Sequence, residues 1–324
     1  MKTLVIIPNR RLSVFTPPMH EAWRVGLPAT VLPQEEDGSF PPLTGYDIVI
    51  SRIKFRHLMR MPEIDWSGFD GLRVHSDDDG FWDALWSTSP YLGQWQTHIP
   101  RHRFDLMVVT GIRAHEHFEA LGIETVVVHK GFDPATFYDR GQPRSETLVM
   151  YGADYPSRVI ARDRLARAGV KVQRISAPFE QLNNELNLHL ACLVCTLDAP
   201  TPNRGVRGGW DRMLRRTPDI APGPEPMHKL FESVASGCAT FTDWSPDLDQ
   251  LGFVDGLNVI IYRSIDELVE KARHFLARPD ELRRIGTAGS ELARSRHTWE
   301  KRTEVLRSAL LQHAGRVSRN RGAR

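Results

Sequence analysis

Short apolar runs alternate along this chain with longer segments in which apolar residues recur every three or four positions. The short runs, bounded by turn residues, predict buried strands, and the longer spacing predicts helices. In the first part of the chain the pattern predicts a helix over 113–121 and strands at 4–7, 29–32, 47–51, 72–75, 105–110 and 125–129. A second series begins at 147–151 and continues with strands at 171–175, 191–197, 239–242 and 259–262.

The two series predict the fold class. Short buried strands that alternate with helices form parallel sheets in βαβ units, so the chain is α/β with two Rossmann-like, doubly wound domains. The length of 324 residues also suggests two domains. Residues 131–146 are rich in Gly, Pro and charge, which is typical of a linker. We therefore predict an N-terminal domain at 1–141 and a C-terminal domain at 142–297.

The C-terminal third carries clear helix boundaries. Ser264 and Glu267 have the spacing of a capping box, which predicts the start of a helix. Pro279 should end that helix. Thr298 can cap a last helix from Trp299 to about 312. We expect the Arg-rich tail after Gly315 to fray.

Composition and charge restrict the function classes. The chain is 41% hydrophobic and 25% charged, contains no 18-residue apolar stretch, and has three cysteines. These features predict a cytoplasmic protein without a transmembrane segment or a disulfide framework. The net charge is +2, but residues 294–324 carry nine Lys/Arg against two acidic residues. Because the basic surplus is confined to one end, it is weak support for nucleic-acid binding.

The segment most informative about chemistry is residues 222–237. Pro226 suits the first position of a helix and Gly237 its end, and the apolar residues between them form one stripe. Glu225, Lys229 and Glu232 lie on the other side. A helix N-terminus with a lysine suits a phosphate or diphosphate, and carboxylates further along suit sugar hydroxyls. The same spacing also fits the solvated polar face of an amphipathic helix.

Several pieces of this region resemble one family in their order. They are residues 229–237 (Lys-Leu-Phe-Glu-Ser-Val-Ala-Ser-Gly), 256–262 (Gly-Leu-Asn-Val-Ile-Ile-Tyr), 266–268 and 297–299. Together they resemble the C-terminal domain of group 1, family 4-like glycosyltransferases, closest to the spore-maturation-protein-like branch. The strong match covers residues 222–311, and residues 130–137 are similar to the segment that joins the domains in this superfamily.

The resemblance implies the GT-B fold, in which two Rossmann-like domains face each other across a cleft and the final helix, here within 298–324, crosses back to the first domain. It implies a glycosyltransferase that uses a UDP- or GDP-sugar as co-substrate, with no other cofactor and no required metal. Glu232 matches the family glutamate that binds the donor ribose, and Lys229 matches the basic residue near the donor phosphates. A further family glutamate would fall at Pro224, so Glu225 is carried over as the contact to sugar hydroxyls.

A second candidate for the donor site begins the C-terminal domain. Gly152 follows a predicted strand and precedes a helix, a position where a phosphate can approach the backbone. Relatives often carry two basic residues here; Ala153 replaces the first, and Arg158 supplies the second. An ordinary strand–helix turn with a surface arginine is the alternative interpretation.

Candidates for the acceptor side follow the strand at 72–75. His75 or Asp77 could act as a general base if the enzyme inverts the anomeric centre. Asp77 and Asp79 could alternatively hold Mg²⁺ or Mn²⁺, as in the GT-A fold. The second βα series after residue 145 argues against GT-A.

The acceptor is not identified: a glycan, a lipid, a protein, a small molecule and DNA all fit. One alternative function is therefore a DNA-modifying glycosyltransferase that acts on a hydroxylated base. Another is a non-catalytic nucleotide-sugar-binding protein, since Pro224 stands where the family has a glutamate.

Overall fold

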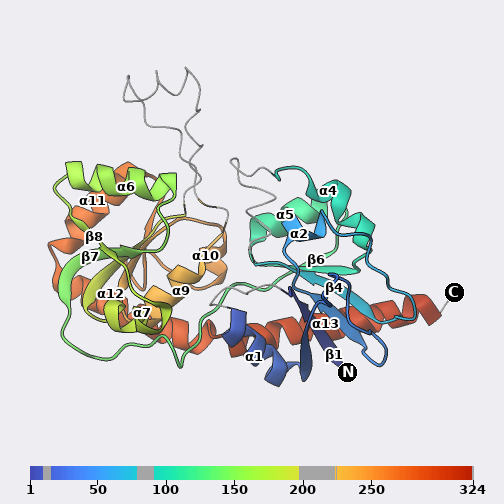
Figure 1. Cartoon of the computed structure of the whole chain (residues 1–324). Helices are drawn as coiled ribbons and strands as arrows, with labels where there is room; N and C mark the ends of the chain where they lie inside the picture. The colour runs from blue at the N-terminus through green and yellow to red at the C-terminus, as the bar shows by residue number, and fades with distance from the viewer. Residues whose placement is uncertain (10–15, 79–90, 197–222, 224, 323–324) are drawn as a thin grey trace, which may run out of the picture. The chain divides into compact units, whose positions relative to one another are not determined.

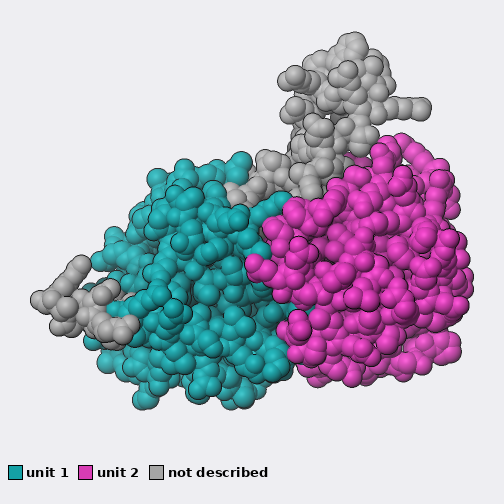
Figure 2. Space-filling model, turned by 180° about the vertical axis from the view of Figure 1, so that it is seen from behind, with its two compact units in different colours: residues 1–133, 297–324 teal, residues 134–296 magenta. Residues whose placement is uncertain are grey.

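The computed structural model describes residues 1–9, 16–78, 91–196, 223 and 225–322. The chain divides into unit 1, residues 1–133 and 297–324, and unit 2, residues 134–296 (Figure 2). A strand is present at each of the eleven positions that the hydrophobic pattern predicts, with ends that differ by a few residues. No helix in the described ranges has both the length and the apolar character needed to cross a membrane.

Unit 1 is built on a parallel sheet of six strands in the order β2-β1-β3-β4-β5-β6. Its strands are β1 Thr3–Ile7, β2 Ala29–Pro33, β3 Ile48–Ser51, β4 Leu72–Ser76, β5 Leu106–Val109 and β6 Thr125–Val127. Its helices are α1 Thr16–Gly26, α2 Phe55–Leu58, α4 Trp95–His98, the 3₁₀ turn Pro100–His102, α5 Ile112–Ala120 and α13 Trp299–Gly322.

The last helix, α13, belongs to unit 1, where it lies beside α1 and beneath the sheet (Figure 1). Trp299, Leu306 and Leu310 of α13 are buried in the same apolar cluster as Trp23 of α1 and the strand residues around Val5. Burying side chains of this size removes a large apolar area from water, which fixes the end of the chain on unit 1.

Unit 2 contains a parallel sheet of five strands in the order β11-β10-β9-β7-β8. Its strands are β7 Ser145–Tyr151, β8 Val172–Ile175, β9 His189–Val194, β10 Ala239–Asp243 and β11 Ile260–Tyr262. Its helices are α6 Pro156–Arg167, α7 Phe179–Leu186, α9 His228–Ala235, α10 Asp247–Gln250, α11 Ile265–Leu276 and α12 Pro279–Arg296.

The strand order of unit 2 fixes where a ligand can bind. The chain leaves β7 towards β8 on one side and leaves β9 towards β10 on the other, so the topology reverses between β7 and β9. In α/β sheets a crevice forms at the carboxyl ends of the two strands at such a reversal. Helices α6 and α11 pack together near β7, whereas α7 and α9 pack against β9 (Figure 1).

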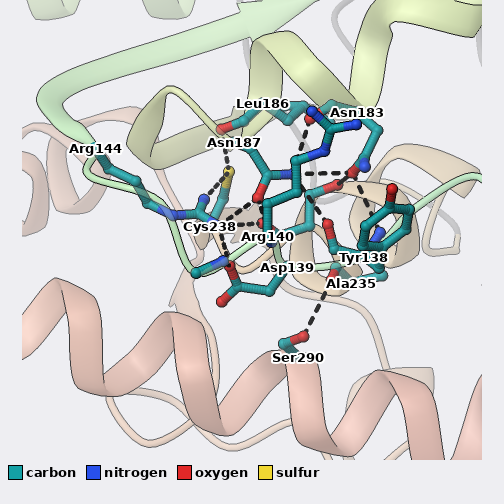
Figure 3. A network of polar contacts seen from close by, with 12 residues as sticks. Tyr138, Asp139, Arg140, Arg144, Asn183, Leu186, Asn187, Ala235, Cys238 and Ser290 are labelled. Carbon is teal, nitrogen blue, oxygen red and sulfur yellow. Dashed lines mark hydrogen bonds and ion pairs between the residues drawn. The ribbon is translucent and has the colours of Figure 1, made fainter.

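The chain passes from unit 1 to unit 2 after Asp133, eight residues before the boundary at 141 that the linker composition predicts. The reason is a polar network that attaches residues 138–144 to α7 and to the end of α9 (Figure 3). Asn187 accepts hydrogen bonds from Arg140 N at 2.8 Å and from Arg144 at 2.8 Å. The Arg144 guanidinium also bonds Asp139 at 2.6 Å and the Ser236 carbonyl at 2.7 Å. A linker composition does not show such contacts.

The predicted helix boundaries of the C-terminal third are mostly confirmed. Ser264 caps α11 by accepting the Glu267 N–H at 3.1 Å, although the Glu267 carboxylate accepts the N–H of Arg263 rather than that of Ser264. Helix α11 ends before Pro279, where α12 begins.

The predicted end of the last helix is wrong, since α13 continues through Gly315 to Gly322. The carboxylate of Glu124 binds His313 at 2.8 Å and Arg316 at 3.0 Å, and these contacts hold the helix to unit 1 on both sides of the glycine.

Candidate functional site

A group of polar and charged side chains lies at the carboxyl ends of β7 and β9 in unit 2. Arg158, the third residue of α6, is buried and spans this position. Its guanidinium donates one hydrogen bond to the carbonyl of Ala153 after β7 at 2.8 Å and another to the carbonyl of Cys195 after β9 at 3.1 Å. Arg158 therefore places a positive charge at the topological reversal of the sheet.

Gly152 directly follows β7 and has a conformation that requires glycine. Its φ is +90°, and a Cβ built on it would lie 1.9 Å from Lys229 Nζ and 3.3 Å from the Arg158 guanidinium. Lys229 Nζ donates a hydrogen bond to the carbonyl of Tyr151 at 2.9 Å. The absence of a side chain at Gly152 thus lets Lys229 lie directly against the backbone, beside a second cation, Arg158, and such a cluster of cations suits a phosphate.

Helix α9 supplies the second half of the group. Lys229 lies in its first turn and Glu232 in its second, both on the side that faces Tyr151. The Tyr151 hydroxyl donates a hydrogen bond to Glu232 Oε2 at 2.7 Å and reaches the Lys229 carbonyl at 3.3 Å. The apolar stripe of α9 is buried, and Glu232 is only 2% exposed. The interpretation of this side of the helix as a solvated polar face is therefore wrong for Glu232.

Burial changes the acid–base properties of both charged residues. Burial, together with the charge of the neighbouring Arg158, lowers the pKa of Lys229 from 10.5 to about 7. Burial raises the pKa of Glu232 from 4.5 to about 7, against the opposing effects of the Tyr151 hydrogen bond and the Lys229 charge. Groups with shifts of this size at the carboxyl edge of an α/β sheet are typical of ligand sites.

Asp243, at the end of β10, organises the segment that leads into α9. Its buried carboxylate accepts hydrogen bonds from Thr196 N at 2.8 Å, from the Thr196 hydroxyl at 2.6 Å and from Gly223 N at 3.0 Å. A Cβ at Gly223 would lie 2.4 Å from the Thr196 hydroxyl, so glycine is needed there. Asp243 thereby holds together the residues on either side of the segment 197–222.

Helix α9 begins two residues later than the position of Pro226 predicts. Met227 is the N-cap, with extended φ and ψ of −87° and 162°, and the first helical residue is His228 rather than Pro226. Glu225 precedes the helix and is buried, with 1% of its surface exposed. Its predicted role as a sugar contact stays a prediction; Pro224 lies outside the described residues.

The two candidates for the acceptor side, His75 and Asp77, lie in unit 1, and both side chains are buried. His75 is fully buried between the rings of Trp95 and Phe104, and burial lowers its pKa to about 3. The imidazole has no exposed surface in this structure, and its predicted role as a general base stays a prediction. Asp77 is 7% exposed and accepts the N–H of Phe55 at 2.8 Å, at the start of α2.

Sequence reasoning missed a polar cluster at the carboxyl edge of unit 1. Arg52, which follows β3, forms a two-pronged ion pair with Asp78, at 2.5 and 2.9 Å, and bonds the Ser76 hydroxyl at 3.0 Å. Its guanidinium also lies 5.2 Å from the ring centre of Trp23. The strand positions in the sequence predict that the ends of β3 and β4 lie at one edge of the sheet. They do not predict that the side chains of Arg52 and Asp78 pair. Among the described residues no group of three His, Cys, Asp or Glu side chains could hold a metal ion, and Asp79 lies outside them.

Comparisons with known proteins agree with the fold. Residues 213–308 match the family model described as glycosyl transferase-like. A search of curated protein sequences gave no match. A sucrose-phosphate synthase from Thermosynechococcus elongatus superposes with a TM-score of 0.65 at 12% identity, over 96% of this chain and 98% of the other. The Anabaena protein HepE, in complex with UDP and glucose, superposes with a TM-score of 0.63 at 13% identity, over 96% and 100%.

The chain therefore has the GT-B fold, with two Rossmann-like units each built on a parallel sheet. The family match covers α9 and most of the second half of unit 2, which includes Lys229, Glu232 and Asp243. It does not distinguish the spore-maturation-protein-like branch, which stays a prediction.

Proposed function

We propose that this protein is a glycosyltransferase that moves a sugar from a nucleoside-diphosphate sugar to an acceptor, and that unit 2 binds the donor. The observation that carries the proposal is the convergence of Gly152, Arg158, Lys229 and Glu232 at the carboxyl ends of β7 and β9. The family match over residues 213–308 supports the same conclusion, as does the UDP bound to the structurally similar HepE.

Each group has a role that follows from its chemistry. The diphosphate would lie against Gly152 and the first turn of α9, where Lys229 and Arg158 supply positive charge and the helix dipole favours an anion. Glu232 would accept hydrogen bonds from the ribose hydroxyls. As the glycosidic bond breaks, negative charge develops on the leaving diphosphate, and cations already in position stabilise it.

We propose that the chemistry needs no metal, because Lys229 and Arg158 would supply the positive charge that neutralises the diphosphate. Sugar transfer or donor hydrolysis should then continue in excess EDTA. A complete loss of activity on chelation, restored by Mg²⁺ or Mn²⁺, would contradict this part of the proposal.

The function is tested with a panel of UDP-, GDP-, ADP- and dTDP-sugars, measured as release of the nucleoside diphosphate. We expect turnover of one donor class and its loss in Lys229→Ala and Glu232→Ala, whereas Glu270→Ala, an exposed glutamate on α11, keeps wild-type activity. Lack of nucleotide binding by the folded wild type would refute the proposal.

A non-catalytic nucleotide-sugar-binding protein is the second candidate, supported by Pro224 at the position of the family glutamate. The same panel separates the two functions. Binding of a nucleotide sugar without hydrolysis, and without transfer to acceptors that include duplex DNA with hydroxylated bases, would favour the binding protein.

A further inference from the structure

Tyr151 contacts the site in a way that the proposed function does not yet use. It is the last residue of β7, and its hydroxyl lies 2.7 Å from Glu232 Oε2 although the two residues are 81 positions apart. Both side chains are buried, with 7% and 2% of their surfaces exposed. A buried phenol that donates to a buried carboxylate fixes the orientation of both groups.

The carboxylate depends on this contact. Within the described part of the chain, the Tyr151 hydroxyl is the only hydrogen-bond donor to the Glu232 carboxylate. Lys229, one turn earlier on α9, attracts it through its charge, but its Nζ donates instead to the Tyr151 carbonyl. Without the phenol, Glu232 would be a buried acid with no direct partner, which strongly favours its neutral form.

We propose that Tyr151 is a positioning residue for recognition of the donor ribose. It holds Glu232 Oε2, so that the carboxylate stays ionised and offers its other oxygen, Oε1, to the ribose hydroxyls. The inference rests on the proposed function, because it assumes that a nucleoside diphosphate binds to unit 2. If Tyr151 has this role, the preference for ribose over a sugar without the hydroxyls depends on both Tyr151 and Glu232, and not on Glu232 alone.

The charges around the pair define its pH dependence. Besides Tyr151 on β7, the groups that act on Glu232 and Lys229 are Arg158 on α6, Arg174 on β8 and Cys192 on β9. Burial raises the pKa of Glu232 to about 7 even with the Tyr151 hydrogen bond, which lowers it. Loss of the phenol hydroxyl must therefore raise this pKa further, and ribose recognition would then need a more alkaline solution.

The experiment compares UDP with 2′,3′-dideoxy-UDP by calorimetry between pH 5.5 and 9. The ratio of the two affinities cancels the diphosphate contacts, including the titration of Lys229, and leaves the ribose contact. For the wild type we expect a ratio of about tenfold above pH 7, the range of a hydrogen bond to a charged group, which falls as the pH decreases through about 7. In Tyr151→Phe the ratio at pH 7 should fall towards one and recover only at higher pH.

Tyr262→Phe is the matched control. Tyr262 ends β11, is also buried, and donates its hydroxyl to the Val194 carbonyl at 2.9 Å rather than to a carboxylate. Its loss removes a comparable buried hydrogen bond and should leave the affinity ratio and its pH profile unchanged.

The possible outcomes separate this inference from the proposed function. If the wild type binds neither UDP nor GDP, the proposed function fails, and the inference fails with it. If the wild type binds UDP but Tyr151→Phe keeps the wild-type ratio and pH profile, only the inference is wrong. If Tyr151→Phe does not fold, Tyr151→Met replaces it, since it also removes the hydroxyl: a ratio near one at pH 7 that recovers at higher pH supports the inference, and the wild-type ratio and pH profile overturn it.

Discussion

Gly152 provides the sharpest test of the donor site, because the fold requires glycine at this position whether or not a ligand is bound. Gly152→Ala adds one methyl group to a residue with φ of +90°. The new Cβ would lie 1.9 Å from Lys229 Nζ and 2.8 Å from Lys229 Cε, so the lysine must move away. Moving it breaks the 2.9 Å hydrogen bond from Nζ to the Tyr151 carbonyl.

The expected cost has two parts. A residue with a side chain in the left-handed region costs about 1 kcal/mol, and loss of a hydrogen bond from a charged donor costs about 2 kcal/mol more. A total of about 3 kcal/mol in a domain of this size corresponds to a fall in Tm of roughly 6–12 °C. UDP affinity should decrease about tenfold or more, because the methyl group displaces Lys229 and covers the backbone that the diphosphate would approach.

Gly169→Ala separates the two parts. Gly169 also lies in unit 2 with a φ of +81°, but a Cβ there has no heavy atom within 4 Å. This variant should lose only about 1 kcal/mol and should bind UDP like the wild type. Differential scanning calorimetry and titration calorimetry measure both quantities. Equal losses of stability and equal UDP affinities in the two variants would refute the placement of Lys229 against Gly152.

Three further predictions follow from other contacts. Asp243→Asn should lower the free energy of unfolding by about 2–3 kcal/mol, because an amide cannot accept all three hydrogen bonds at that position. Asp249→Asn, at an exposed position of α10, should change it little, and equal urea midpoints of the two variants would contradict this. Asp78→Asn should cost unit 1 about 3 kcal/mol in urea unfolding, since it leaves the buried Arg52 guanidinium without its carboxylate. The folded pKa of Glu232, about 7, lies above its ordinary value of 4.5, so its contribution to stability is present below pH 4.5 and is lost as the pH rises through 7. Relative to Glu232→Gln, the wild type should therefore lose about 3 kcal/mol of unfolding free energy over that range, and a constant difference between the two proteins would exclude the shift.

The local parts of this fold could be predicted from the sequence because each depends on neighbouring residues. A buried strand appears as an apolar run, and Ser264 with Glu267 identifies a helix start from four consecutive positions. Lys229 and Glu232 could be paired in advance because three residues of helix bring them to one side. Gly152 could be selected because a strand end before a helix is a recurrent phosphate position.

The remaining contacts could not be predicted, since they join distant segments. Tyr151 and Glu232 are separated by 81 residues, and only the adjacency of β7 and β9 brings their elements together. Asp243 carried a usable signal, because a carboxylate at the carboxyl end of a buried strand faces the ligand edge of the sheet. His75 has the same signal, yet its ring turns into the core between Trp95 and Phe104. Alternation along a strand decides which side of the sheet a residue faces, not whether a loop or helix covers it.

The charges of the donor site explain why a ligand would be favoured there. The pKa of Lys229 is lowered and that of Glu232 is raised. Both shifts mean that the charged form of the side chain is less well stabilised in the fold than in water. A diphosphate would restore the missing counter-charge for Lys229 and Arg158, and ribose hydroxyls would restore donors for Glu232. Lys229 and Glu232, whose charged forms the fold of unit 2 compensates poorly, are therefore groups that a nucleoside diphosphate would satisfy, which is the physical reason for assigning the donor to this unit.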